Sequence, residues 1–157
     1  MKAAGISEIK QELTNTPPEQ LLELCIQLVK YKKENKELLS YLLFQSHDTD
    51  NYLKNVKTEM DELFAAINTA NLYFVKKSLR KILRFMVKHT KYMASRQSEA
   101  ELLIHFCNNL KQSAVPFYKS TALTNLYNQQ VKKIKAAVAL LHEDLQYDYL
   151  KQLEQLS

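Results

Sequence analysis

The sequence predicts an all-α protein of seven or eight antiparallel helices joined by short connections. Apolar residues recur three or four positions apart along most of the chain, which is the period of an amphipathic helix. The 157 residues include one glycine and three prolines, and the hairpin dipeptides Asn-Gly and Asp-Gly do not occur. A chain of this length is typical of one domain, so we expect a single helical domain over residues 1–157.

Three helices are expected at the start of the chain, the first over residues 7–13. Residues 16–19 read Thr-Pro-Pro-Glu, which predicts a second helix with Thr16 as its N-cap and a glutamate completing a capping box. Asn35 is expected to cap the third helix. That helix should pack centrally, because it leaves little polar surface. Its apolar residues are Leu38, Leu39, Tyr41, Leu42, Leu43 and Phe44.

The middle of the chain predicts two long helices. Asp48 or Asp50 should cap the first of them, whose apolar stripe reaches Ile67. The asparagines of residues 68–71 predict a break in the helical pattern. Residues 72–93 then show an apolar stripe without interruption, so we expect one long amphipathic helix there.

Two or three more helices are expected at the C-terminal end. Residues 98–101 read Ser-Glu-Ala-Glu, a second capping box that should open a helix. After a proline loop, Ser120 or Thr121 restarts the helical pattern. Apolar residues then repeat every three or four positions to Leu156. This stretch is either one long helix or two helices with a bend near His142.

Two architectures fit this succession of helices. One is a closed helical bundle, and the other is a short stack of antiparallel helix pairs, an α–α superhelix. In its helix lengths the chain resembles the armadillo and HEAT repeat proteins, and that resemblance implies the stacked arrangement. The sequence favours the stack slightly and leaves both architectures open.

Charges are segregated along the chain. Residues 63–142 hold 13 Lys or Arg and two acids, whereas residues 1–62 hold 8 basic and 11 acidic residues. Residues 143–157 hold Lys151 against four acids. The formal net charge of +5 therefore conceals a strongly basic middle segment. Such segregation bears on partners and association rates, and not on the fold.

The expected helix 72–93 carries seven of these cations. Successive residues turn about 100° around a helix axis, so the apolar side chains fall on one side and a column of cations on the other. The column consists of Lys77, Lys81, Arg84, Lys88 and Lys91, and Lys76 and Arg80 flank it. No acid lies on this helix, so no side chain of the helix itself neutralises the column.

Three explanations compete for this basic face. It is a solvated surface balanced by acids nearby, such as Glu59, Asp61 and Glu62; or a docking surface for an acidic protein; or a contact surface for nucleic-acid phosphates. Phe74, Phe85 and Tyr92 share one flank of the helix, where packing is a better explanation than stacking on unpaired bases.

The functional prediction is a non-enzymatic helical scaffold that presents its basic face to an acidic protein partner. The alternative is a nucleic-acid-binding protein that contacts phosphates through the same residues. One glycine excludes a glycine-rich phosphate loop and a Gly-x-Ser-x-Gly nucleophile elbow. Glu101 and His105 share a helix face, where a polar surface pair is a better explanation than a metal site, and we expect no metal or cofactor.

The remaining predictions concern location. Cys25 and Cys107 lie in apolar helical stretches, which favours two buried, reduced thiols in a cytoplasmic protein. The longest charge-free, largely apolar stretch, residues 63–75, is shorter than the ~20 residues that span a membrane. Charged residues interrupt the first apolar positions, so we expect neither a signal peptide nor a membrane partner.

Overall fold

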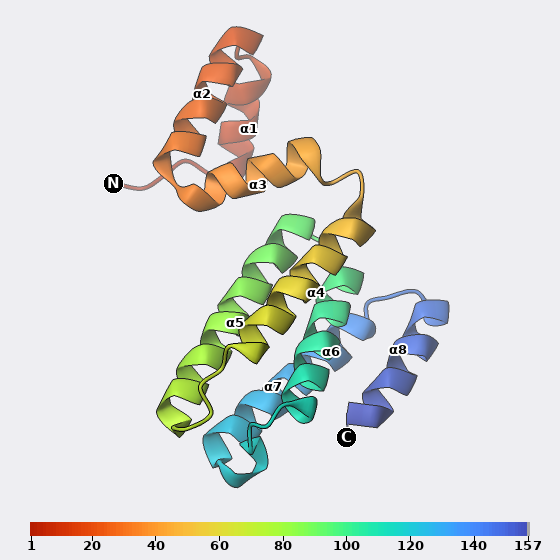
Figure 1. Cartoon of the computed structure of the whole chain (residues 1–157). Helices are drawn as coiled ribbons and strands as arrows, with labels where there is room; N and C mark the ends of the chain where they lie inside the picture. The colour runs from red at the N-terminus through yellow and green to blue at the C-terminus, as the bar shows by residue number, and fades with distance from the viewer. Residues whose placement is uncertain (157) are drawn as a thin grey trace. The chain divides into compact units, whose positions relative to one another are not determined.

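The computed structural model describes residues 1–156, which form helices joined by short connections and contain no strand (Figure 1). This confirms the predicted all-α class. Within these residues, eight α-helices and one short 3₁₀-helix follow one another. They are α1 (Ile6–Thr14), α2 (Pro18–Tyr31), α3 (Lys33–Phe44), α4 (Thr49–Ala65), α5 (Leu72–Met93), α6 (Arg96–Gln112), the 3₁₀-helix η1 (Phe117–Lys119), α7 (Thr121–Val138) and α8 (Glu143–Leu156).

The helices fall into two compact units. Residues 1–45 contain α1 to α3, and residues 46–157 contain α4 to α8. Both units are compact packings of helices, and the choice between a closed bundle and a helical stack stays open. The single domain over residues 1–157 stays a prediction.

The helix boundaries in residues 1–45 correct two predicted caps. Pro17, and not Thr16, is the N-cap of α2, and Pro18 is its first helical residue. A residue that precedes proline is held in the extended conformation, which moves the start of α2 one position onward. Asn35 lies inside α3, and its side-chain amide donates to the carbonyl of Leu28 over 2.7 Å. It therefore satisfies a backbone acceptor near the end of α2.

The prediction that α3 packs centrally is wrong. Leu42, Leu43 and Phe44 are all exposed, and Tyr41 is the one buried residue of this helix. None of the residues of α1 and α2 is buried. A unit this small has too little chain to cover the apolar residues of this helix on every side.

Residues 46–157 form their core around α6. This helix contacts α4, α5, α7 and α8, and α4 and α5 lie side by side (Figure 1). Leu102, Phe106, Cys107 and Leu110 of α6 are fully buried. The other helices each turn one apolar stripe toward α6, which is the arrangement that the three- and four-residue spacing predicts.

Local caps in residues 46–157 agree with the sequence in most places. The side chains of Asp48, Asn71 and Ser120 accept hydrogen bonds from the first turns of α4, α5 and α7. The helical pattern after Ser120 divides into α7 and α8 with a break before Glu143, so the two-helix alternative is confirmed. The N-cap of α6, however, is Ser95 and not Ser98, because the Ser95 hydroxyl accepts a hydrogen bond from the Ser98 amide while Ser98 itself is buried.

Candidate functional site

Helix α5 has its apolar stripe against the core and its cations outside. Asn71 caps it by accepting a hydrogen bond of 2.8 Å from the Tyr73 amide. Val75, Leu79, Ile82 and Met86 are at most 2 % exposed, so one side of the helix is fixed in the core. Residues that lie 100° to 200° around the helix axis from this buried stripe must then face outward, as the sequence predicts.

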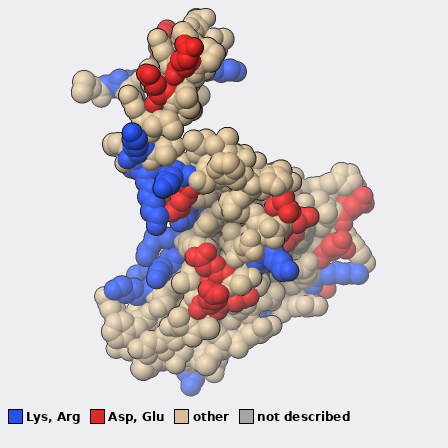
Figure 2. Space-filling view, turned by 45° about the horizontal axis from the view of Figure 1, so that its top comes forward, with Lys and Arg blue, Asp and Glu red and all other residues tan. Residues whose placement is uncertain are grey.

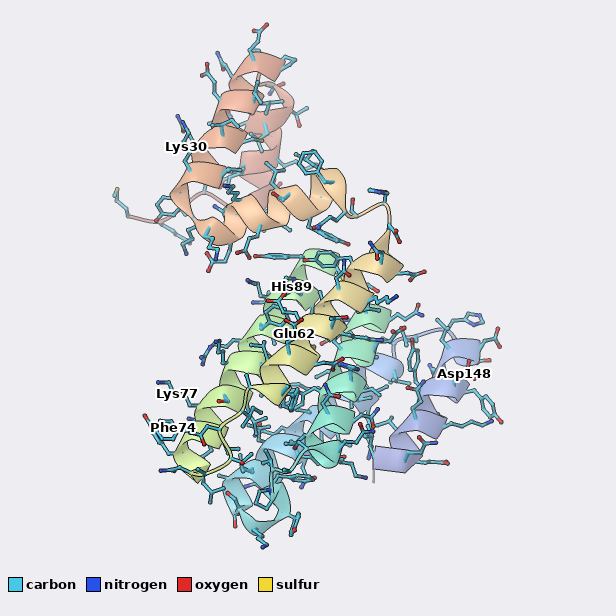
Figure 3. The ribbon with its side chains drawn as sticks, in the orientation of Figure 1. Lys30, Glu62, Phe74, Lys77, His89 and Asp148 are labelled. Carbon is cyan, nitrogen blue, oxygen red and sulfur yellow. The ribbon has the colours of Figure 1, made fainter. Side chains whose placement is uncertain are left out.

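The seven predicted cations lie on the outer side of α5, and we name them the basic ridge. Figure 3 shows Lys77 on this outer side. Five members are exposed, and Lys76 and Lys88 are partly buried. The Lys88 ammonium lies 6.0 Å from the centre of the Phe85 ring. The exposed members are Lys77, Arg80, Lys81, Arg84 and Lys91.

Lys88 left aside, ion pairs within residues 46–156 do not neutralise the ridge. All of its cations except Lys88 are without a carboxylate partner there. Among the acids that the sequence offers as a counterweight, Asp61 binds elsewhere, at 2.6 Å from both His105 and Asn109. Figure 2 shows Lys and Arg atoms gathered along one side of the molecule, with Asp and Glu atoms on adjacent surface.

The aromatic flank of α5 is mostly occupied by packing. Tyr92 is buried, and the Phe85 ring lies 4.4 Å from the His89 ring, measured between centroids. His89 in turn is hydrogen-bonded to the Tyr52 hydroxyl of α4 over 2.6 Å. Phe74 is 46 % exposed at the start of the helix (Figure 3). These contacts agree with the packing explanation and leave Phe74 as the member of the flank that is open to a base.

A cleft that the sequence did not reveal lies beside the C-terminal half of the ridge. Its volume is about 630 Å³, and α5, α6 and α7 line it. It brings Lys91 of the ridge close to Arg96 and Lys133. Lys133 is distant in sequence and sits on another helix, so no local pattern could have predicted this grouping.

A second, polar cleft of about 470 Å³ lies between α4, α6 and α8. In it Glu101 accepts hydrogen bonds of 2.8 Å from both Lys57 and the Tyr149 hydroxyl. Burial, and then the hydrogen bond to Glu101, raise the pKa of Tyr149 to about 12. Glu101 and His105 bind different partners, since His105 is hydrogen-bonded to Asp61. These hydrogen bonds connect α6 to α4 and α8. No group of three or more potential metal ligands occurs among residues 1–156.

The two cysteines differ, and the prediction that both are buried is wrong for Cys25. Cys25 lies exposed on α2, a helix with no buried residue, whereas Cys107 is fully buried in α6. Burial raises the pKa of the Cys107 thiol to about 12, against a small opposing effect of Lys111. The thiolate is the reactive form, so Cys107 should be inert in the folded protein.

A thiol titration should therefore separate the two residues. Native protein treated with Ellman's reagent at about pH 8 is expected to release one equivalent rapidly, and the second only as the fold opens, at least about 100-fold more slowly. The Cys25→Ser variant should lose the rapid phase and keep the slow one. Two rapid equivalents, or a rapid phase that persists in Cys25→Ser, would contradict the assignment.

Comparisons with protein-family models, with curated proteins and with solved structures find no match to this chain. Among residues 1–156 no helix combines the length and the apolar character that crossing a membrane requires. The function of this chain is therefore inferred from the geometry and charge of the site.

Proposed function

We propose that this chain is a non-enzymatic binding protein whose helix α5 presents a basic face to an acidic protein partner. The observation that carries the proposal is that six cations of one helix have no carboxylate partner within residues 46–156. They are Lys76, Lys77, Arg80, Lys81, Arg84 and Lys91. A cytoplasmic location stays a prediction.

The ridge works against the stability of its own helix. Like charges four positions apart on a helix cost a few tenths of a kcal/mol each, and α5 contains no acid to offset them. Two cations outside the ridge do pair with acids in residues 46–156: Lys57 with Glu101, and Arg96 with Glu99, both at 2.8 Å. A surface that stays unpaired at a cost to stability is best explained by a partner that brings the opposite charge.

Nucleic acid is the second candidate, favoured by the length of the ridge. Lys77 and Lys91 are fourteen residues apart, which on a helix is about 21 Å, enough to follow several phosphates. Against it stands the aromatic flank, where Tyr92 is buried and Phe85 packs on His89. A phosphate bound to the cations of the cleft beside Lys91 would also leave the apolar lining of that cleft uncovered. These points favour a protein partner.

Fluorescence anisotropy with three labelled probes tests the proposal. The probes are a polyglutamate peptide, a random duplex DNA and a random single-stranded RNA, each titrated at about 0.05 and 0.15 M salt. The protein is expected to bind polyglutamate at both salt concentrations. Reversing Lys77, Lys81 and Arg84 to Glu should weaken that binding at least tenfold, about 1.4 kcal/mol.

A matched variant controls for net charge. Reversing Lys119, Lys132 and Lys135, which lie outside α5, changes the total charge equally and should weaken binding less than about threefold. Equal losses in the two triple variants would remove the ridge as the site. Binding of DNA or RNA that is tighter than that of polyglutamate and depends on the ridge would decide for the nucleic-acid alternative.

A further inference from the structure

The cleft beside the ridge has three helical walls. α5 and α7 both contact α6, and the cleft of about 630 Å³ lies where the C-terminal half of α5, the N-terminal half of α6 and Lys133 of α7 come together. The turn from α5 into α6 closes one end, through Ala94 in the left-handed conformation with φ of 48°. The volume lies within the usual 300–1,000 Å³ of binding pockets.

The cleft combines apolar and basic residues. Met86 and Leu103 provide apolar lining, each 2 % exposed, and Val87 lies beside them and is 39 % exposed. Lys91, Arg96 and Lys133 are the cations that line it. Apolar side chains of a ligand can therefore be buried here while its charged groups remain among the cations.

The charge at the cleft is one-sided. Its one acid, Glu99, is paired with Arg96 at 2.8 Å, whereas Lys91 and Lys133 have no carboxylate partner within residues 46–156. Neither α5 nor α7 contains an aspartate or glutamate. Two of the three walls thus contribute positive charge alone, and the complementary ligand is anionic.

We infer that this cleft receives the apolar side chains of an acidic amphipathic helix from a partner protein. The inference rests on the proposed function and adds to it the place and the chemistry of docking. An amphipathic helix carries apolar residues on one stripe and can carry acids on both sides of that stripe. Its stripe fits the lining around Val87, and its acids fit Lys91 and Lys133. Phosphates alone would leave the apolar lining uncovered.

Two synthetic peptides of the same composition test the inference. Both have about 18 residues of leucine and glutamate, long enough to form helix, but one places its leucines on a single stripe and the other scatters them. The striped peptide is expected to bind at least about tenfold more tightly than the scattered peptide at about 0.15 M salt. Equal affinities would overturn the inference and leave the proposed function standing.

Lys133 and Lys135 provide a matched pair of variants. Both are exposed cations of α7, but two positions along a helix place them on opposite sides, and only Lys133 lines the cleft. Lys133→Glu should weaken binding of the striped peptide about tenfold, and Lys135→Glu less than about twofold. Equal effects of the two reversals would overturn the cleft as the docking site.

The apolar requirement needs a neutral substitution. Val87→Gln introduces a good helix former and keeps the net charge, and it should weaken binding of the striped peptide but not of polyglutamate. Leu150→Gln on α8, at a residue 49 % exposed and outside the cleft, is the control and should change neither.

Loss of all binding in the ridge triple variant, with no effect of Val87→Gln or Lys133→Glu, would uphold the proposed function and overturn this inference. Self-association of the protein alone that Lys133→Glu abolishes would instead assign the cleft to a second copy of the chain, and would also overturn it.

Discussion

Replacing Phe106 by alanine is expected to lower the free energy of unfolding by about 3–5 kcal/mol, the cost of a large cavity in a packed core. Phe106 is fully buried at the centre of α6, and its ring lies 5.3 Å from that of Phe64, measured between centroids. Since α6 contacts every other α-helix of residues 46–157, the lost contacts lie at the centre of that unit and not at its edge. Urea titration followed by circular dichroism measures the change.

A second phenylalanine of the same unit serves as the control. Phe74 is 46 % exposed at the start of α5, so Phe74→Ala should cost less than about 1 kcal/mol. The midpoint of Phe106→Ala should fall to lower urea with little change in slope, as expected when stability changes and the surface exposed on unfolding does not. Similar midpoints for the two variants would contradict the central place of α6.

Helix α5 shows how much of this molecule local sequence can predict. Its predicted range of residues 72–93 matches the structure, because an asparagine cap and an unbroken apolar stripe act within a few residues of each other. The outward direction of the ridge follows from the same stripe. Once Leu79 and its neighbours are buried, the helical period decides where Lys77 and Arg84 point.

The misplaced caps show where local signals compete. Ser95 and Ser98 are both suitable N-caps. The sequence favours Ser98 as the N-cap, because acids follow it in the pattern of a capping box. The structure uses Ser95, because an earlier start lets Ser98 and Ala100 pack into the core. Burial of that first turn is a tertiary effect, which residue types at a cap cannot report.

The cleft and the position of α3 depend on contacts between distant residues. Lys91 and Lys133 are brought together by the packing of their helices on α6, and nothing in either helix alone signals the other. For helix α3, the sequence predicts more burial than the structure has. Its apolar composition suggested a central place, yet Phe44 is 70 % exposed, because burial depends on which neighbours are near and not on composition alone.

Raising the pH from about 9 to about 12 is expected to destabilise the fold through Tyr127 and Tyr149, by about 2–3 kcal/mol for each. Burial raises the pKa of Tyr127 from 10.0 to about 12, with a smaller contribution from Cys107. Burial, and then the hydrogen bond to Glu101, raise the pKa of Tyr149 from 10.0 to about 12 as well. Both phenols are nearly inaccessible, at 7 % and 6 % exposure.

The sign follows from the protons bound in each state. Between about pH 10 and 12 the unfolded chain has released its phenolic protons while the folded protein keeps them, so the unfolded state binds fewer protons. The stability that these residues contribute is fully present below pH 10 and is lost as the pH rises through 12. Cys107, with its pKa raised from 9.0 to about 12, acts in the same direction.

The double variant Tyr127→Phe/Tyr149→Phe isolates the effect. It should be less stable near neutral pH, because Tyr127 donates a 2.6 Å hydrogen bond to the Leu156 carbonyl and Tyr149 donates one to Glu101. Its unfolding free energy, measured by urea titration at intervals from about pH 8 to 11.5, should nevertheless fall less steeply than that of the unaltered protein. Tyr118→Phe, at a residue 71 % exposed, should leave the slope unchanged. The double variant would contradict this prediction if it lost stability with pH as steeply as the unaltered protein. Deprotonation of Cys107 or of the lysines would then cause the loss of stability at high pH.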